Sequence, residues 1–306
     1  MSKIFKALQK GSDELSHAVL ASFDEEPPVT GTAPAAAPAE PVQAEPATPS
    51  APLMLPADSA PMRTLPIELR GKSPLLPFDG TNFGASEQYR LIRTRLLQHS
   101  RQPRFLLISS TGPRDGKSVT AVNIAGALAL KTEAKVLLAD LDLRRSILHT
   151  WLGLPGSPGL AEVLTGTASM NHALVKIEQL PNLYFLPAGA PQVNPGELLD
   201  SDRWRWISNH LRADFRYIVA DVPPVASVAD YELLQASCDG VVLVVRPDNT
   251  RREACYRTLK LIAKDKLIGV VMNDVSDWFF TRRTPYNSYY SVYERSASDL
   301  TRAAVG

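Results

Sequence analysis

The chain has 306 residues, of which 44% are hydrophobic and 21% charged, the composition of a soluble protein that can bury a core. A formal net charge of +1 lacks the basic excess that nucleic-acid binding requires, so nucleic acid is not an expected partner. Cys238 and Cys255 make no disulfide framework, and no apolar run approaches the roughly 20 residues that span a bilayer, so we expect a cytoplasmic protein without its own transmembrane segment.

The first 80 residues do not have the composition of a folded domain. Residues 1–26 predict a short amphipathic segment, with lysines between the apolar side chains of Ile4, Phe5, Leu8, Leu15 and Val19. A frayed terminus and a docking helix for a partner or a membrane surface both fit this pattern. The segment 27–80 contains eleven prolines among alanines in its first part, residues 27–66. This composition favours an extended chain of roughly 3 Å per residue. We expect a disordered linker that acts as a tether.

A different pattern begins at residue 81 and continues to residue 278. Six short apolar runs predict buried strands, at residues 104–110, 135–141, 183–188, 216–222, 240–245 and 267–273. Helical patterns separate most of them, at residues 118–131, 195–211, 228–237 and 250–264. Apolar strands that alternate with helices predict one α/β domain, in which helices cover both faces of a mainly parallel sheet.

The stretch "SSTGPRDGKSVT" follows the first predicted strand of this domain and opens its first long helix. "GKS" is the core of a P-loop, whose backbone N–H groups hold phosphates while the lysine reaches the β- and γ-phosphates. The serine hydroxyl is expected to bind Mg²⁺. The sequence therefore predicts a P-loop NTPase domain that binds ATP and Mg²⁺ through Thr111, Gly112, Pro113, Arg114, Asp115, Gly116, Lys117, Ser118 and Val119.

Carboxylates follow two other predicted strands. Asp140 and Asp142 end the run "VLLADLD", and Asp221 ends "YIVAD". Because the carboxyl ends of parallel strands meet at one edge of a sheet, we expect these acids beside the P-loop. Asp142 and Asp221, with Ser118, would hold Mg²⁺, and Lys117 would neutralise a transferring phosphoryl group. Asp140 is the candidate that orients or deprotonates an incoming hydroxyl, but the assignment between Asp140 and Asp142 stays open.

The tail at residues 279–306 contains the stretch "YNSYYSVY", which has neither helical nor strand periodicity. The tyrosine rings could pack on a neighbouring surface. Alternatively, they accept phosphoryl groups in turn, which explains the clustering better, since each phosphotyrosine adds about −1.5 to −2 charges and can act as a switch. The expected phosphoacceptors are Tyr286, Tyr289, Tyr290 and Tyr293.

In this order, "SSTGPRDGKS", "VLLADLDLRR" and "YIVADVPPV" resemble the Walker A, A′ and B motifs of the bacterial tyrosine autokinases, the kinases of capsule and exopolysaccharide machinery. The resemblance covers about residues 84–294 and includes "SEQYRLIRTRL", in which Glu87, Arg90 and Arg93 match the family's E-x-x-R-x-x-R helix. It implies an ATP- and Mg²⁺-dependent protein-tyrosine autokinase that phosphorylates its own tail and regulates polysaccharide synthesis and export.

The resemblance also implies partners. Glu87, Arg90 and Arg93 would contact a neighbouring subunit in a homo-oligomeric ring, so that the tail of one copy reaches the phosphates of the next; the alternative is a solvated, charged helix face. A chain without a membrane span resembles the separate form of the kinase, which docks on the cytoplasmic end of a transmembrane polysaccharide chain-length regulator. We therefore expect recruitment to the inner face of the plasma membrane.

Several positions depart from the family pattern. Arg114 replaces a glycine, Asp115 replaces a glutamate, and Val222 stands where serine or threonine is usual. A nucleotide-gated regulatory binding protein with little kinase activity would tolerate these changes and remains an alternative. A MinD/ParA-like ATPase is a second alternative, although Gly112 stands where that type carries another signature lysine.

Overall fold

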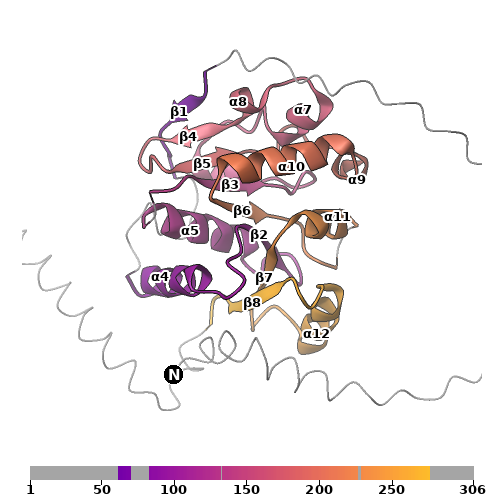
Figure 1. Cartoon of the computed structure of the whole chain (residues 1–306). Coiled ribbons are helices and arrows are strands. Elements are labelled where there is room, and N and C mark those ends of the chain that lie inside the picture. The colour runs from indigo at the N-terminus through magenta and orange to yellow at the C-terminus, as the bar shows by residue number, and fades with distance from the viewer. Residues whose placement is uncertain (1–60, 70–82, 132, 227–228, 276–306) are drawn as a thin grey trace, which may run out of the picture.

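One sheet organises the residues that this computed structural model describes, namely 61–69, 83–131, 133–226 and 229–275 (Figure 1). Its eight strands lie in the order β1-β4-β5-β3-β6-β2-β7-β8. They are β1 Arg63–Leu65, β2 Phe105–Ser110, β3 Val136–Asp140, β4 Val175–Ile177, β5 Leu183–Leu186, β6 Tyr217–Asp221, β7 Gly240–Val245 and β8 Leu267–Met272. Neighbouring strands are parallel except for β4 and β5, which are antiparallel.

The central strands are apolar along most of their length. All residues of β2, β3 and β7 are buried, as expected when helices cover both faces of a parallel sheet. Strands β3, β6 and β2 are adjacent, and their register pairs Asp221 with Asp140 on one side and with Ile108 on the other. The carboxyl ends of these three strands therefore lie together at one edge.

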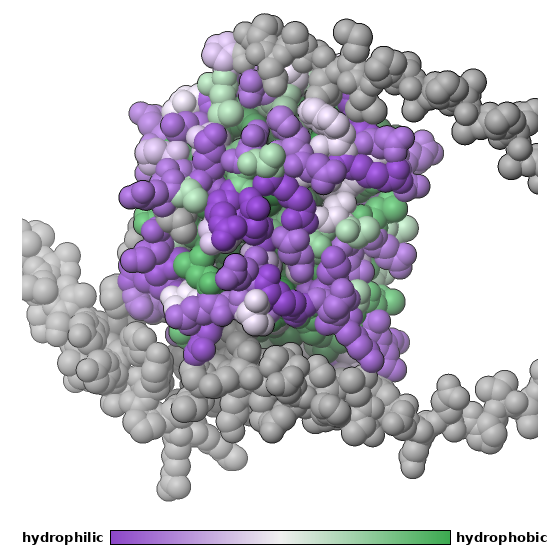
Figure 2. All heavy atoms as spheres, viewed as in Figure 1, coloured by the Kyte–Doolittle hydropathy of each residue, from purple (hydrophilic) through white to green (hydrophobic). Residues whose placement is uncertain are grey.

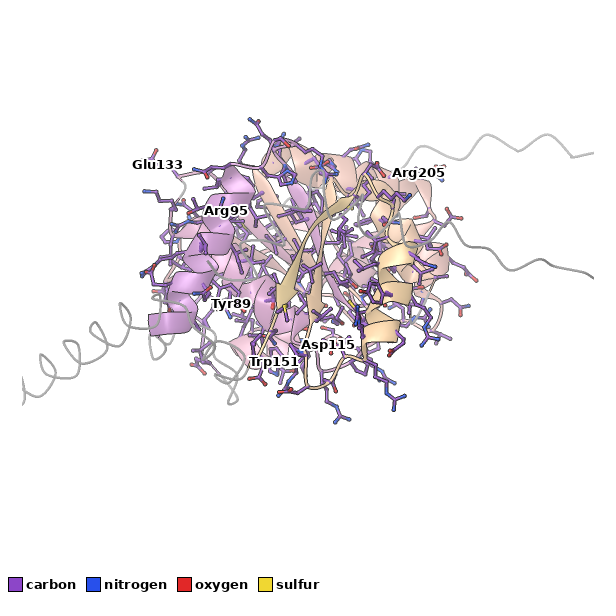
Figure 3. All side chains as sticks on the ribbon, turned by 90° about the horizontal axis from the view of Figure 1, so that it is seen from below. Tyr89, Arg95, Asp115, Glu133, Trp151 and Arg205 are labelled. Atoms are coloured by element: carbon purple, nitrogen blue, oxygen red, sulfur yellow. The ribbon has the colours of Figure 1, made fainter. Side chains whose placement is uncertain are left out.

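Helices cover both faces of the sheet (Figures 1 and 3). One face carries α4 Phe83–Leu97, α5 Lys117–Ala129 and α6 Leu148–Leu152 around one apolar cluster. The other carries α7 Leu160–Thr165, α8 Met170–Ala173, α9 Pro195–Leu199, α10 Asp202–Asp214, α11 Asp230–Ser237 and α12 Arg252–Leu261 around a second cluster. Figure 3 shows Tyr89 and Arg95 of α4 on one side of the sheet and Arg205 of α10 on the other. The predicted fold class is confirmed.

The structure differs from the sequence prediction in three elements. The linker prediction includes residues 61–69, but β1 pairs with β4, and Ile67 N donates to Gln179 Oε1 (2.9 Å). Strand β4 is absent from the prediction, because three residues are too few to show a period. The helix expected at 195–211 is two helices, because Ser201 Oγ accepts from Trp204 N (3.2 Å) and caps α10.

Other parts of the predicted organisation lie outside the described residues. These are the amphipathic segment at 1–26, the rest of the linker except 61–69, and the tail from residue 276. The predicted kinase-domain range of 81–278 contains all the described elements from α4 to β8.

Helix α4 is held against the sheet by one stripe of side chains. Ile92 and Leu96 are buried in the cluster, and Tyr89 packs against it. Glu87 and Arg90 form an ion pair with each other. Arg93 Nη1 donates to the carbonyl of Ala127 in the last turn of α5 (3.3 Å), so Arg93 already has an intrachain role at a helix end.

The face shown in Figure 2 carries mostly hydrophilic side chains, with apolar ones between them. No helix in the described ranges is both long and apolar enough to cross a bilayer. Both cysteines are free thiols.

Asp239 lies just before β7, at the edge of the sheet opposite the carboxyl ends of the strands. Its Oδ2 accepts hydrogen bonds from Phe105 N (2.8 Å) and Arg104 N (2.9 Å) at the start of β2. Arg212 of α10 donates to the same carboxylate (2.9 Å). Burial alone would raise the pKa of Asp239, but these backbone hydrogen bonds and Arg212 outweigh burial and lower it below the ordinary value.

We expect Asp239→Ala to lower the free energy of unfolding by about 1 kcal/mol at pH 7, because two partly buried backbone N–H groups lose their acceptor. A lowered folded pKa means that the charged form stabilises the fold above about pH 4 and that this stability disappears as pH falls through the folded pKa. Urea unfolding followed by circular dichroism should therefore show a large difference between variant and wild type at pH 7 and a smaller one at pH 3. The exposed Asp214→Ala is the control, and an equal difference at both pH values would contradict this role.

Candidate active site

The P-loop connects β2 to the N-terminus of α5. Gly116 is the N-cap of α5, and within the described residues no side chain caps the helix. The first N–H groups of a helix have no intrahelical partner, and the helix dipole favours an anion beside them. The loop therefore ends in a helix N-terminus of the kind that can bind a phosphate.

Two residues of the loop have a left-handed backbone. Gly116 has φ +97°, and a Cβ built on it would lie 1.9 Å from Asn273 Nδ2, so both conformation and space require glycine. Arg114 has φ +66° although it carries a Cβ. This explains why the family pattern has glycine at position 114, and it locates backbone strain in this chain's loop.

Asp115, labelled in Figure 3, holds the P-loop through hydrogen bonds of its side chain. Its side chain is buried, with Oδ2 accepting from Gly112 N (2.9 Å). Its Oδ1 accepts from Asn249 Nδ2 (2.7 Å) and Thr250 Oγ1 (2.8 Å), which follow β7. Asn273 Nδ2, just after β8, donates to Asp115 O (3.0 Å). The carboxylate of Asp115 thus positions the loop.

Lys117 lies between the two acids expected to hold a metal. Its Nζ is 3.3 Å from Asp142 Oδ2 and 3.2 Å from Asp221 Oδ1, and its side chain is only 15% exposed. Ser118 Oγ donates to Asp221 Oδ2 (2.6 Å). The structure therefore brings together the lysine, the serine and both predicted metal-holding acids.

The electrostatics of this cluster favour an added cation. Burial alone would lower the pKa of Lys117, but Asp221 and Asp142 outweigh it and raise the pKa. Burial raises the pKa of Asp221 in spite of its contacts with Lys117 and Ser118. Burial and then the charge of Asp221 raise the pKa of Asp140 to about 7. The single ammonium group of Lys117 thus lies among three buried acidic side chains.

Asp140 is farther from the surface than its expected role suggests. It is fully buried, and its Oδ1 accepts from Asp142 N (3.2 Å). Its Oδ2 accepts from Ser146 Oγ (2.8 Å) and Leu148 N (3.4 Å). A phenol cannot touch Asp140 in this arrangement, whereas Asp142 is slightly exposed.

The cluster fits ATP with Mg²⁺. A serine hydroxyl and two carboxylates are oxygen ligands of the kind that Mg²⁺ prefers, and Mg²⁺ commonly keeps several waters and binds substrate phosphates. In the described part of the chain, no group of three or more His, Cys, Asp or Glu side chains lies close enough together to hold a metal ion. In addition, Thr111 Oγ1 is buried without a hydrogen-bond partner among the described residues.

Val222 does not face this cluster. Its side chain is fully buried in the apolar cluster under α7 to α12. The valine therefore takes no hydroxyl away from the place where Ser118 and the carboxylates meet.

Sequence reasoning missed the residues that support the site from a distance. Asn249, Thr250 and Asn273 hold Asp115, as described above. Arg144 donates to both carboxylate oxygens of Asp230 (2.7 and 3.1 Å) and ties the loop after β3 to α11. They are single polar residues in loops or at element ends, so no local pattern marks them.

Comparison with known proteins shows to which family this chain belongs. The family model described as "Cellulose biosynthesis protein BcsQ" matches residues 105–279, so the domain belongs to that family of α/β proteins. The tyrosine-protein kinase YwqD of Bacillus subtilis (strain 168) is 38% identical over 192 residues, which cover 61% of this chain and 80% of YwqD. The chain belongs to the bacterial tyrosine kinase family.

Other members of the tyrosine kinase family match the same region. The putative tyrosine-protein kinase EpsB of Ralstonia solanacearum is 33% identical over 211 residues, which cover 68% of this chain but only 28% of EpsB. The crystal structure of the chimerical protein CapA2B2 superposes with a TM-score of 0.63 at 28% identity, covering 72% of this chain and 95% of that one. The resemblance inferred from the motifs is confirmed.

We expect Arg114→Gly to raise the free energy of unfolding by about 1 kcal/mol. A left-handed residue with a Cβ costs roughly 1–2 kcal/mol, and glycine removes this cost. Part of the gain is lost because glycine gives up more conformational entropy on folding. Arg114→Ala keeps the Cβ and should leave the stability unchanged. Urea unfolding of the three proteins without nucleotide measures the difference. Equal stabilities of the glycine and alanine variants would show that the loop is not strained.

Proposed function

We propose that this chain is an ATP- and Mg²⁺-dependent protein-tyrosine kinase that phosphorylates its own tail and regulates exopolysaccharide or capsule synthesis and export. The observation that carries the proposal is the position of Lys117, at the N-terminus of α5 and between Asp142 and Asp221. Membership of the tyrosine kinase family supports the choice of tyrosine as the acceptor.

The reaction transfers the γ-phosphoryl group to a phenol. The tyrosine oxygen forms a bond to the γ-phosphorus, the bond to the bridging oxygen breaks, and ADP leaves with that electron pair. Lys117 and the N–H groups of α5 stabilise negative charge on the phosphates, and Asp142, which unlike Asp140 is slightly exposed, receives the phenol proton. Mg²⁺, when bound near Ser118, Asp142 and Asp221, supplies further neutralisation of phosphate charge.

Assembly belongs to the same proposal. Glu87, Arg90 and Arg93 of α4 would contact a neighbouring copy in a ring, in which one copy phosphorylates Tyr286, Tyr289, Tyr290 and Tyr293 of the next. Of these three residues, Arg93 already donates to Ala127 O, and Glu87 forms an ion pair with Arg90. The cytoplasmic end of a transmembrane chain-length regulator would recruit the protein to the inner face of the plasma membrane.

We expect Lys117→Met to lower phosphotyrosine formation by about 10²–10³-fold, the usual effect of removing one charge-stabilising group from a transition state. The purified full chain is incubated with labelled ATP and Mg²⁺, with and without the regulator's cytoplasmic segment. Lys131→Met, an exposed lysine just after α5, is the matched control. Thermal unfolding checks the fold, because the change leaves Asp142 and Asp221 without their cation.

The products of that incubation distinguish the alternative functions. Formation of phosphotyrosine supports the kinase, and formation of free phosphate alone supports a MinD/ParA-like ATPase. If no product forms, the result supports a regulatory binding protein. Undiminished phosphotyrosine formation by Lys117→Met would contradict the assignment of phosphoryl transfer to this loop.

We expect replacement of Tyr286, Tyr289, Tyr290 and Tyr293 by phenylalanine to remove most autophosphorylation and to leave ATP binding intact. Four phosphotyrosines would add roughly −6 to −8 charges to a chain of net charge +1, so like-charge repulsion should loosen an assembly. Light scattering should then give a smaller mass for the phosphorylated wild type than for the unphosphorylated form. Phosphates mapped by mass spectrometry to other residues, with these four unmodified, would contradict the tail assignment.

A further inference from the structure

Helix α12 presents a basic surface to solvent, at the end of the sheet that carries β7 and β8 (Figure 1). Residues 251–264 contain five basic side chains and one acidic side chain, a net charge of +4. The basic face of α12 consists of Arg251, Arg252, Arg257, Lys260 and Lys264, all of which are exposed. The other side of the helix carries the buried Thr258 and the partly buried Leu259, which packs on the apolar core.

This positive charge costs the helix stability. Arg251 is the N-cap of α12 and Arg252 its first residue, a helix end at which the dipole favours anions over cations. Arg257 and Lys260 are three positions apart, a spacing at which like charges repel each other on a helix. Such a face gains stability when an anion binds to it.

Two exposed side chains on the same helix suit an aromatic ligand. Arg252 Nη2 donates to Tyr256 Oη (3.1 Å), and its guanidinium carbon lies 5.4 Å from the centre of the Tyr256 ring. Tyr256 is 37% exposed and Leu261 is 49% exposed. An arginine can bind a phosphate through two parallel hydrogen bonds, and an exposed ring and leucine can pack on an aromatic ring. Together these groups match phosphotyrosine better than a bare anion.

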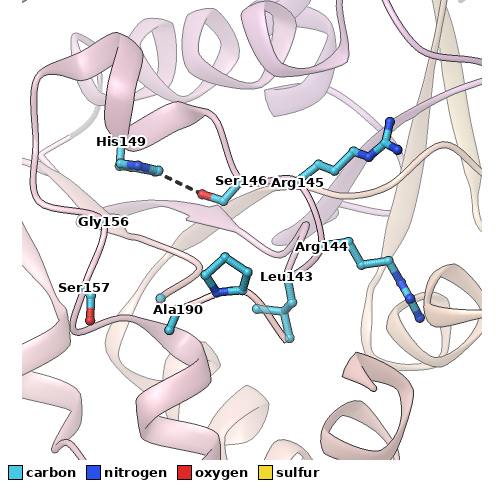
Figure 4. Close-up of a pocket in the computed structure, with 10 residues that line it drawn as sticks. Leu143, Arg144, Arg145, Ser146, His149, Gly156, Ser157 and Ala190 are labelled. Carbon is cyan, nitrogen blue, oxygen red and sulfur yellow. Dashed lines mark hydrogen bonds between the residues drawn. The ribbon is translucent and has the colours of Figure 1, made fainter. Parts of the chain in front are cut away.

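A second set of arginines belongs to the candidate active site. Arg144 and Arg145 line a cavity of about 330 Å³ between the loops after β3 and β5 (Figure 4). Both loops leave the sheet at the edge that carries the P-loop, because β3 and β5 are parallel neighbours. Arg144 is also bound to Asp230 (2.7 Å). No residue of α12 lines this cavity, so the basic face of α12 is a separate surface.

The tail of this chain can reach α12. Asp274 forms an ion pair with Arg246, which begins the loop that leads into α12, and the described part ends one residue later at Val275. Tyr286 is eleven positions after Val275, up to about 36–40 Å along an extended chain. The ten residues of α12 are about 15 Å long, and Tyr286 to Tyr293 spans up to about 23–25 Å. Several tail tyrosines can therefore face α12 at the same time.

We propose that the basic face of α12 binds the phosphorylated tail of the same chain. The phosphates contact Arg252, Arg257 and Lys260, and a phosphotyrosine ring packs on Tyr256 or Leu261. Four phosphotyrosines carry roughly −6 to −8 charges, which complement the +4 of residues 251–264. The proposal rests on the proposed function, because the kinase reaction makes the ligand. Docking removes the modified tail from the site of phosphoryl transfer and holds it on its own subunit.

The first test is the binding of a synthetic peptide that copies residues 284–295 with phosphate on all four tyrosines. The parent is the full chain with its four tail tyrosines changed to phenylalanine, and ADP and Mg²⁺ are present to occupy the P-loop. We expect Arg257→Glu with Lys260→Glu to weaken binding about tenfold or more, because two attractive charges become repulsive. The control is Lys131→Glu with Lys135→Glu, the same charge change on two exposed lysines at the opposite edge of the sheet.

The control should bind the phosphopeptide like the parent, and the unphosphorylated peptide should bind to the parent at least tenfold more weakly. Circular dichroism checks that each variant is folded. The proposal is overturned if the parent binds both peptides equally, or if the control loses as much affinity as Arg257→Glu with Lys260→Glu. It is also overturned if the parent binds vesicles of phosphatidylserine and phosphatidylcholine but not the phosphopeptide, because the face is then a membrane surface.

A second test addresses docking within one chain. The autophosphorylated full chain is treated with a tyrosine phosphatase, and the loss of phosphotyrosine is followed over time. We expect Arg257→Glu with Lys260→Glu to lose phosphate about threefold faster than the wild type, at a ratio that does not depend on protein concentration. An equal rate in both proteins, or protection that grows with concentration, overturns docking on the same chain.

The two proposals can fail separately. If the synthetic phosphopeptide binds to α12 but the wild-type chain forms no phosphotyrosine from ATP, the docking surface stands and the proposed function fails. If the wild-type chain forms phosphotyrosine but Arg257→Glu with Lys260→Glu binds the phosphopeptide like the parent, the proposed function stands and the docking surface fails.

Discussion

The burial of a lysine among aspartates is the constraint on which the rest of this site depends. Moving an ion out of water costs several kcal/mol, so a buried ammonium needs carboxylates close by and buried carboxylates need cations. The strand order β3-β6-β2 meets this requirement, because it brings Asp142 and Asp221 to Lys117 from adjacent strand ends. Asp140, Asp142 and Asp221 thus outnumber the one ammonium group of Lys117 beside them.

The P-loop is held in shape by residues that are distant in sequence but lie at the same edge of the sheet. Asp115 accepts from Asn249 and Thr250 after β7, and Asn273 after β8 contacts both Asp115 and Gly116. A loop fixed in advance does not have to reorganise when negative charge develops on a bound phosphate. The strain at Arg114 is tolerated because these contacts determine the loop's conformation.

The range of each interaction decided how much of this protein could be predicted from its sequence. Local patterns predicted six strands and the P-loop, and the rule that parallel strand ends share an edge placed Asp142 and Asp221 near Lys117. Alternation along a strand does not reveal depth, so the complete burial of Asp140 was not predictable. The support of Asp115 was also hidden, because Asn249 and Asn273 are 134 and 158 positions away and carry no motif.

The two outermost strands of the sheet lie at the two ends of the described part of the chain, residues 61 and 275. Strand β1 connects to the segment before residue 61, and β8 connects to the tyrosine-bearing tail. Seven strand spacings lie between them, about 34 Å. The described chain therefore enters the sheet at one rim and leaves it at the other, so a contact made at one rim does not cover the other.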